Sequence, residues 1–255
     1  MAQTAPELSP SSDDLLIDVR HVSKSYGEHP VIRDISMEVS EGEVVCIIGV
    51  SGCGKSTLLK LIGGLETPDD GEIILGDPNV AFVFQYSALF DSLNVFENVA
   101  FSLLEEPDQR QKKRPTLKPR EIRAQAEEKL RLVGLEGIED KLPSELSGGM
   151  KKRVSFARAI MSNPRIILYD EPTAGLDPIA STMIEDYILK LRDELGAASV
   201  VVTHQHSTIQ RTADRVLLLH EGVVQWSGSP KELLSSDNPY ARQFSQASLE
   251  GPLAD

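Results

Sequence analysis

Short apolar runs with the spacing of β-strands dominate the first third of the chain. They cover residues 15–22, 32–39, 44–48, 71–76 and 80–85. Glu41-Gly42 is a turn signal before the run at 44–48, which is apolar throughout. Alternating runs are typical of strands with one face on the core, and continuous apolar runs of strands buried on both faces. We therefore expect an antiparallel sheet beside a parallel core.

The periodicity changes in the middle of the chain, where apolar residues recur every three or four positions. Asn94 is suited to cap a helix over 95–104, and a second helix over 121–133 ends at Gly134. The apolar face of the second helix holds Ile122, Ala126, Leu130 and Val133. The pattern predicts an α-helical subdomain at about 87–162, inserted in the core.

The strand pattern returns in the last third of the chain. Apolar runs cover residues 166–169, 200–203, 215–219 and 223–226. Asp177-Pro178 starts and Gly196 ends a helix between the first two runs, which makes a βαβ unit with parallel strands. Glu221-Gly222 joins the last two runs as a hairpin. The fold class is thus a mainly parallel α/β core with an antiparallel β subdomain.

The pattern predicts one domain over 15–236 with a segment at each end. Residues 1–14 are rich in Ser, Pro and acidic residues, and we expect them to be flexible. Residues 237–255 form a tail with a short helix, whose apolar positions are Tyr240, Phe244 and Ala247. This tail either docks on the body or on a second copy, or is a solvated terminus.

The composition limits the partners and the compartment. The 255 residues suffice for one large α/β domain, and 26 basic against 39 acidic residues give a net charge of −13, which disfavours nucleic acid as the main partner. Cys46 and Cys53 lie in a strand and a loop and fit a reducing compartment; we interpret them as space-filling in preference to redox regulation through Cys53. No apolar stretch reaches the ~18 residues of a membrane helix. If the chain works on a membrane, we expect another subunit to span it.

A glycine-rich stretch over 49–57 reads GVSGCGKST and matches the phosphate-loop pattern GxxxxGK[ST]. It follows the apolar run at 44–48 and opens a helical run at 58–62. Glycines let the backbone curl so that successive N–H groups point at one anion, and the helix start adds its positive end. We expect Lys55 to reach the β- and γ-phosphates and Ser56 to bind Mg²⁺. The residues expected to hold the nucleotide are Gly49, Ser51, Gly52, Cys53, Gly54, Lys55, Ser56 and Thr57.

Two adjacent carboxylates follow the apolar run at 166–169. Asp170 would lie at the carboxyl edge of the sheet beside the phosphate loop, where it can hold Mg²⁺ directly or through water. Glu171 is a second carboxylate that can orient and partly deprotonate the attacking water. The pair therefore predicts hydrolysis of the nucleotide.

Three further motifs follow in a fixed order: LSGGM at 146–150, AGLD at 174–177 and VVVTH at 200–204. With the phosphate loop, they resemble the nucleotide-binding domain of ABC transporters across nearly the whole chain. The resemblance implies a P-loop NTPase (RecA-like) core, ATP and Mg²⁺ as cofactors, and Glu171 as the catalytic base. It also implies that His204 contacts the γ-phosphate.

The same resemblance implies roles for other residues. Gln85 would touch Mg²⁺ or the attacking water, and Tyr26 would stack on adenine, since an aromatic face suffices to hold a base. Ser147 and its two following glycines stand at a helix start, and they offer a hydroxyl and bare amides to an anion. By resemblance, this second clamp, Gly148-Gly149 included, serves the ATP of another copy in a head-to-tail dimer. Asp177 would lie across the dimer seam.

Two motif residues that differ from the commonest form in the family, together with other short segments, indicate a subfamily. Met150 stands where Gln is commoner, and Ala174 where Ser is usual. With DPI at 177–179, the segment at 88–100 and RQF at 242–244, they resemble the ATPase subunits of MCE-associated (Mla-like) phospholipid transporters. The resemblance implies two partners, an integral membrane permease and an MCE-domain lipid-binding protein. Because residues 1–14 lack the Arg-rich character of a transit peptide, we expect a peripheral protein on the cytoplasmic face of a bacterial inner membrane.

Three alternative functions fit the residues less well than phospholipid transport. Another ABC importer, such as one for polar amino acids, would more usually carry a Gln signature. A soluble ABC ATPase acting on nucleic acid or ribosomes is disfavoured by the single cassette and the acidic charge. A non-hydrolysing regulatory subunit is disfavoured by the complete motifs at Lys55, Glu171 and His204.

Two segments are candidates for contact with the membrane complex. The apolar positions after Gln85 could contact a permease, although ordinary helix packing accounts for about half of them; they are Leu89, Phe90, Leu93, Val95 and Phe96. A basic island is either a solvated loop or a contact for anionic headgroups. Its residues are Arg110, Lys112, Lys113, Arg114, Lys118 and Arg120.

Overall fold

The computed structural model describes residues 15–104 and 117–253. The segment at 1–14 and most of the basic island lie outside the described residues; only Lys118 and Arg120 of the island lie inside them. Within the described ranges, no helix is both long enough and apolar enough to cross a membrane.

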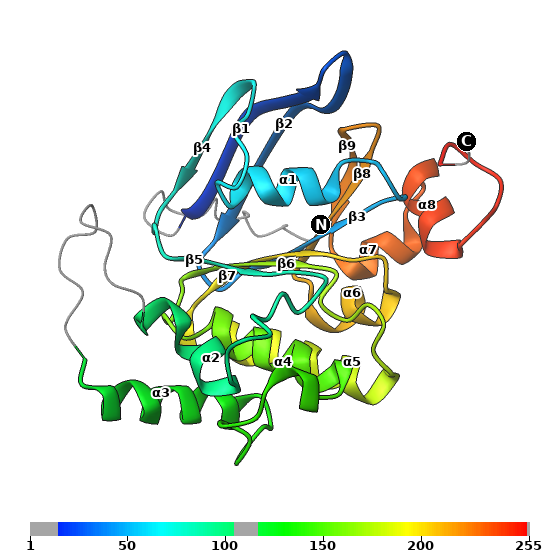
Figure 1. Ribbon diagram of the computed structural model, residues 1–255. Coiled ribbons are helices and arrows are strands. Elements are labelled where there is room, and N and C mark those ends of the chain that lie inside the picture. Colours follow the sequence, from blue (N-terminus) through cyan, green and yellow to red (C-terminus); the bar gives the residue numbers. More distant parts are fainter. Residues whose placement is uncertain (1–14, 105–116, 254–255) are drawn as a thin grey trace, which may run out of the picture.

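The first sheet has three strands, β1 (Leu15–Tyr26), β2 (His29–Ser40) and β4 (Asp70–Leu75), in the order β2-β1-β4. Both pairings are antiparallel, which confirms the predicted antiparallel subdomain. In Figure 1 this sheet forms the upper part of the molecule, with α1 (Lys55–Ile62) beneath it.

The second sheet has six strands in the order β5-β6-β7-β3-β8-β9. Their bounds are β3 (Val44–Ile48), β5 (Val80–Val83), β6 (Ile166–Asp170), β7 (Ala198–Val202), β8 (Arg215–His220) and β9 (Val223–Gly228). All pairs are parallel except the closing β8-β9 hairpin. The prediction that the β5 strand reaches Gln85 is wrong. The ladder stops at Val83, because β5 is an edge strand whose next residues, from Phe84, turn outward into solvent.

Helices cover both faces of the second sheet. Figure 1 shows α1 and the first sheet on one face, and α4 (Gly148–Ala159) and α5 (Pro178–Leu195) on the other. The core accordingly divides into two apolar clusters separated by the sheet. β3 and β7 are buried along their whole length, as expected for strands covered on both faces.

The helical subdomain consists of α2 (Val95–Leu104), α3 (Pro119–Leu132), a 3-10 turn at Pro143–Glu145, and α4. Asn94 caps α2 as predicted: its Oδ1 accepts a hydrogen bond from the Glu97 amide at 2.8 Å. The four apolar positions predicted for the second helix are all buried. This helix starts two residues earlier than predicted, because Pro119 fits the first helical turn, where no amide hydrogen is needed.

The C-terminal tail packs against the body. It contains α8 (Pro239–Gln246), which follows α7 (Pro230–Ser235) of the domain, and its Tyr240 and Phe244 pack against the larger core cluster. Ala247 does not share this face, contrary to the prediction, because it ends α8 in a left-handed conformation and is exposed. The buried Leu253 takes its place. The structure therefore shows a tail that is docked on the body, and not a solvated terminus.

Candidate nucleotide-binding site

The phosphate loop connects β3 to α1 in a backbone shape that requires glycine. Gly49, Gly52 and Gly54 have φ of 150°, 80° and 107°. A Cβ added at Gly49 would lie 2.2 Å from the carbonyl oxygen of Leu219, and one at Gly54 would lie 2.8 Å from that of Val31. A side chain at either position would clash with the neighbouring backbone. The loop can therefore adopt this shape only with glycine at these positions.

A cavity of about 530 Å³ opens above this loop. Its lining residues are Val31, Gly49, Ser51, Gly52, Gly54, Lys55, Ser56, Thr57, Gln85, Glu171, Val202 and His204. All except Val31 and Val202 are residues predicted from the sequence, although they come from segments far apart in the chain. Most of the predicted phosphate-loop residues thus line one cavity together with Gln85, Glu171 and His204.

The Lys55 ammonium is held inside the loop. Its Nζ donates hydrogen bonds to the carbonyl oxygens of Gly49 at 2.9 Å and Val50 at 2.8 Å, and lies 3.8 Å from the Sγ of Cys53. Burial raises the pKa of the Cys53 thiol, and the nearby Lys55 only partly opposes this effect. Because a neutral thiol is a weak nucleophile, the environment of Cys53 fits the space-filling interpretation.

An oxygen pair lies at the start of α1. Ser56 Oγ donates a hydrogen bond to Asp170 Oδ1 at 3.0 Å, so the last residue of β6 meets the first turn of the helix. A hydroxyl and a carboxylate are oxygen ligands of the kind that Mg²⁺ takes. Among the described residues there is no group of three or more His, Cys, Asp or Glu that could hold a metal ion alone. These two residues therefore fit a Mg²⁺ ion that takes its other ligands from phosphates and water.

The Glu171 carboxylate faces His204. Glu171 Oε1 lies 2.8 Å from His204 Nδ1. Glu171 has a positive φ of 47°, and its amide donates to the carbonyl of Val202 at 2.9 Å, which fixes the loop to β7. The other oxygen, Oε2, is buried and has no hydrogen-bond partner among the described residues. A buried carboxylate oxygen at a cavity wall needs a partner, and a water molecule entering with the nucleotide would supply it.

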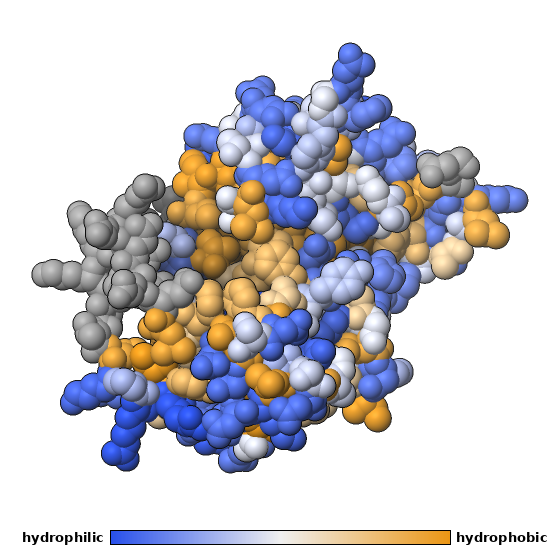
Figure 2. Space-filling model, in the orientation of Figure 1, coloured by the Kyte–Doolittle hydropathy of each residue, from blue (hydrophilic) through white to orange (hydrophobic). Residues whose placement is uncertain are grey.

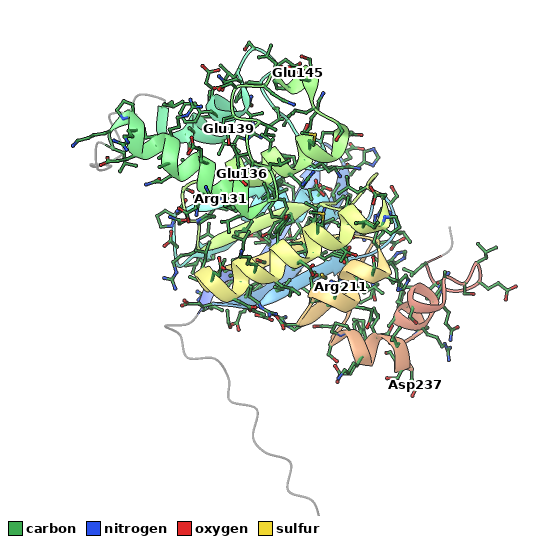
Figure 3. The ribbon with its side chains drawn as sticks, turned by 90° about the horizontal axis from the view of Figure 1, so that it is seen from below. Arg131, Glu136, Glu139, Glu145, Arg211 and Asp237 are labelled. Carbon is green, nitrogen blue, oxygen red and sulfur yellow. The ribbon has the colours of Figure 1, made fainter. Side chains whose placement is uncertain are left out.

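A chain of polar contacts joins Thr173, in the loop that follows Glu171, to α5 and α6 (His206–Thr212), and no motif marks it in the sequence. Thr208 Oγ1 donates to Glu185 Oε1 at 2.8 Å and lies 3.1 Å from Thr173 Oγ1. Because Thr208 has one hydroxyl hydrogen, Thr173 must be the donor in the second contact. Arg211 completes the chain with an ion pair to Glu185 at 2.8 Å. Arg211, labelled in Figure 3, belongs to α6, which packs on α5 and starts just after His204.

Gln85 and Tyr26 differ in how they meet the cavity. Gln85 lines it, although β5 has already ended. Tyr26 is not among the lining residues: its ring is 46% exposed and its hydroxyl donates a hydrogen bond to Glu66. That hydrogen bond raises the pKa of Tyr26, while the hydroxyl of Thr57 acts in the opposite direction. Tyr26 thus lies near the end of the phosphate loop, beside the cavity.

The signature residues lie apart from the cavity. Ser147 caps α4, and its Oγ accepts a hydrogen bond from the Met150 amide at 3.3 Å. Asp177 caps α5 by accepting from the amides of Ile179 at 2.9 Å and Ala180 at 3.0 Å. Neither residue, nor the glycines that follow Ser147, lines the cavity.

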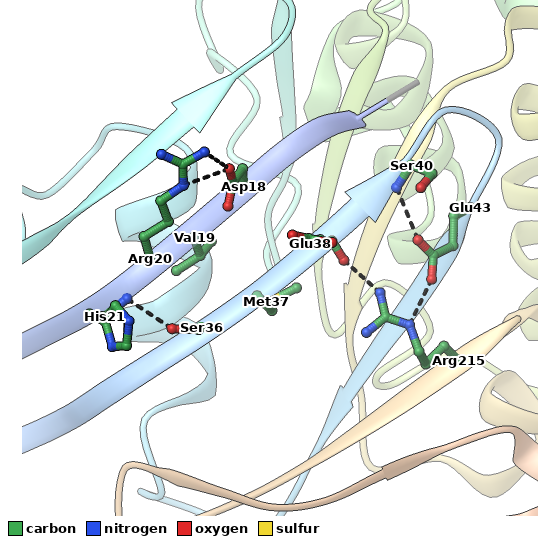
Figure 4. A pocket seen from close by; sticks show the side chains of 10 residues that line it. All are labelled: Asp18, Val19, Arg20, His21, Ser36, Met37, Glu38, Ser40, Glu43 and Arg215. Carbon is green, nitrogen blue, oxygen red and sulfur yellow. Dashed lines mark hydrogen bonds and ion pairs between the residues drawn. The ribbon is translucent and has the colours of Figure 1, made fainter. Parts of the chain in front are cut away.

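A larger hollow of about 780 Å³ lies along β1 and β2 (Figure 4). Four of its charged residues form two ion pairs: Arg20 Nη2 lies 2.6 Å from Asp18 Oδ2, and Arg215 Nε lies 2.8 Å from Glu43 Oε1. None of the residues predicted to bind nucleotide lines this hollow.

The fold and the cavity define a P-loop nucleotide hydrolase. Residues 32–174 match the family described as ABC transporter. The chain is 44% identical over 273 residues to the Arabidopsis thaliana protein TRIGALACTOSYLDIACYLGLYCEROL 3, chloroplastic, over 95% of this chain and 77% of that protein. It is 38% identical over 233 residues to the sulfate/thiosulfate import ATP-binding protein CysA of Pseudomonas syringae, over 88% and 69% of the two chains.

Solved structures agree. The dimeric ATP-binding cassette MJ0796, in a post-hydrolysis state with ADP and Pi, matches with a TM-score of 0.76 at 33% identity, over 84% of this chain and 99% of that one. The structure of cbiO1 from Clostridium perfringens, part of the ABC transporter complex cbiONQ, matches with a TM-score of 0.76 at 29% identity, over 88% and 92%. The chain belongs to the ABC transporter family. It is the ATP-hydrolysing subunit of such a transporter. The predicted fold class and enzyme class are confirmed.

The glycine constraint yields a test of the loop. Gly54→Ala should lower ATP affinity at least about tenfold, because the new methyl group would clash with Val31 and Ile32 and shift the loop. Gly64→Ala is the matched control: its φ is 67° and no described atom lies within 4 Å of an added Cβ. The control should lose only about 1–2 kcal/mol of stability. Fluorescent-nucleotide titration measures both variants, and equal affinities would refute the steric argument.

Proposed function

We propose that this subunit hydrolyses ATP to drive phospholipid transport between membranes, together with a permease and an MCE-type lipid-binding protein. The observation that carries the proposal is the 44% identity, over 95% of the chain, to a protein named after a glycolipid. The similarity to the sulfate/thiosulfate import protein is lower and covers less of the chain. The signature at 146–150, which ends in Met150, and the DPI sequence at 177–179 support the same phospholipid-transport subfamily.

In the proposed site, Lys55 and the loop amides hold the phosphates of ATP. Ser56 and Asp170 hold Mg²⁺, which neutralises phosphate charge when it is bound. Glu171 orients the attacking water and accepts its proton, and His204 keeps Glu171 in place through their contact. Gln85 lines the cavity and lies between Phe84 and Tyr86 in the sequence. It therefore links these exposed apolar side chains to the cavity.

The signature is proposed to act on a second copy. Ser147 is exposed at the start of α4; its hydroxyl accepts from the Met150 amide but keeps its own hydrogen, which it can donate, together with the first amides of the helix, to an anion from outside. The related cassette MJ0796 is dimeric, which supports a two-copy arrangement in which each signature completes the site of its partner. In this arrangement, Tyr26 would lie beside the nucleotide. The seam between the two copies would hold Asp177 and the exposed Ile179.

An exposed apolar surface next to Gln85 is the proposed contact for the permease. Its members are Phe84, Tyr86 and Phe90, all partly or largely exposed. Figure 2 shows that apolar side chains gather near the middle of the face of the molecule that it draws. The buried Asn98 holds the segment: its Oδ1 accepts from the Phe90 amide at 2.8 Å and its Nδ2 donates to the Phe90 carbonyl at 3.1 Å. Of the segment predicted from the sequence, Val95 is buried and belongs to ordinary helix packing.

The second candidate is the import of a small solute, favoured by the 38% identity to the sulfate/thiosulfate import protein. Affinity purification of the tagged complex from its native membranes separates the two functions. Phospholipid transport predicts co-purification of an MCE-domain protein, a permease and phospholipid. Recovery of a solute-binding protein with an import permease, and of no MCE protein, would reject the lipid proposal.

The role of Glu171 has its own test. Glu171→Gln keeps the shape of the side chain but removes the base, so ATP binding should persist while turnover falls about 10²–10⁴-fold. Glu194→Gln is the control, since Glu194 is an exposed carboxylate on α5 away from the cavity. Steady-state phosphate release and nucleotide titration give the two readouts. Similar turnover in both variants would exclude Glu171 as the base.

Phe90→Asp tests the permease contact. Both Phe90 and Ile74 are 43% exposed, but Ile74 lies on β4 in the other sheet. In the reconstituted complex, Phe90→Asp should abolish transport while the isolated subunit keeps its basal hydrolysis, because Phe90 does not line the cavity. Ile74→Asp should keep both activities. Loss of basal hydrolysis and transport together in Phe90→Asp would contradict this surface.

A further inference from the structure

The helix that begins with the signature carries a lysine whose contacts no motif explains. Lys152 lies one turn into α4, and its side chain is partly buried. Its Nζ donates hydrogen bonds to the carbonyl oxygen of Pro172 at 3.4 Å and to that of Ala174. Both acceptors belong to the loop that directly follows Glu171. Lys152 therefore connects the signature helix to the catalytic loop of the same copy.

This loop is a compact unit. The Ala174 amide donates to the Glu171 carbonyl at 3.2 Å, and the Leu176 amide donates to the Thr173 carbonyl at 3.2 Å. Two consecutive turns of this kind move together, because shifting one acceptor alone would break a hydrogen bond of the next turn. A displacement at Ala174 is thus passed to Glu171.

The start of α4 also lies near a side chain of the same loop. A Cβ added at Gly149 would lie 4.0 Å from the Cδ2 of Leu176, which is ordinary van der Waals distance, so the two segments are close without being in steric conflict. The direct link between them is therefore the pair of lysine hydrogen bonds, which hold the start of α4 and the loop in one arrangement.

The electrostatics fit a lysine at this position. Partial burial lowers the pKa of the Lys152 ammonium, and the negative charge of Glu171 acts in the opposite direction. The ammonium thus lies within the electrostatic range of the proposed base. The neighbouring Lys151 carries the same charge on the same helix, so charge alone can be separated from these contacts.

We propose that Lys152 is a positioning residue that couples the signature of one copy to the Glu171 loop of that same copy. Binding of the partner's nucleotide at Ser147 then sets the geometry of the base that acts on the copy's own nucleotide. This inference rests on the proposed two-copy arrangement. It adds a route by which the two nucleotide sites affect one another.

Lys152→Met and the control Lys151→Met test the proposal. Lys152→Met should lower kcat about tenfold, with KM within about twofold, because a charge-assisted hydrogen bond to the loop is lost. Lys151→Met should match the wild type, and Lys152→Arg should recover most of kcat because it keeps a charged donor. Melting temperatures show whether all three variants are folded. A kcat for Lys152→Met equal to that of Lys151→Met would overturn the proposal.

A double-mutant cycle with Ser147→Ala separates coupling from a purely local role. If Lys152 acts through the signature, its substitution should lower kcat less in the Ser147→Ala background than in the wild type. Full additivity of the two losses would overturn the coupling. The proposed two-copy arrangement fails separately: in that case Ser147→Ala alone would leave the hydrolysis of the wild-type background unchanged.

Discussion

The parallel pairing of β6, β7 and β3 is the constraint on which the site depends. Parallel strands end at the same edge of a sheet, so residues that follow them meet there whatever their distance in sequence. The phosphate loop follows β3, Asp170 ends β6, and His204 lies just beyond β7. The continuous apolar sequences of these strands place them in the centre of the sheet, where β3 and β7 are buried on both faces.

The sequence predicted most of this arrangement because local patterns and motifs agree. Strands with period two, capped helices such as the one at Asn94, and the phosphate-loop glycines each depend on neighbours a few residues away. The predictions at Gln85 and Ala247 were wrong about local structure, because the end of an edge strand and of a short helix depend on what covers them.

Other features could not be predicted because they arise only from tertiary contacts. Glu185 is buried in α5, next to the exposed Asp186, and nothing in its local sequence shows that Thr208 and Arg211 will meet it. Lys152 has an identical neighbour, and only the fold decides which of the two reaches the catalytic loop. Side chains that connect separate elements are therefore the part of the site that a sequence conceals.

The contact between Gly49 and Leu219 has a consequence for the order of folding. The floor of the phosphate loop is the backbone of β8, about 170 residues further along the chain. Until β8 pairs with β3, the loop has its glycines but no surface on which to curl. Such a long-range contact forms late, because the intervening chain must be closed first. During synthesis, the ability to hold nucleotide therefore arises only after nearly the whole domain has emerged.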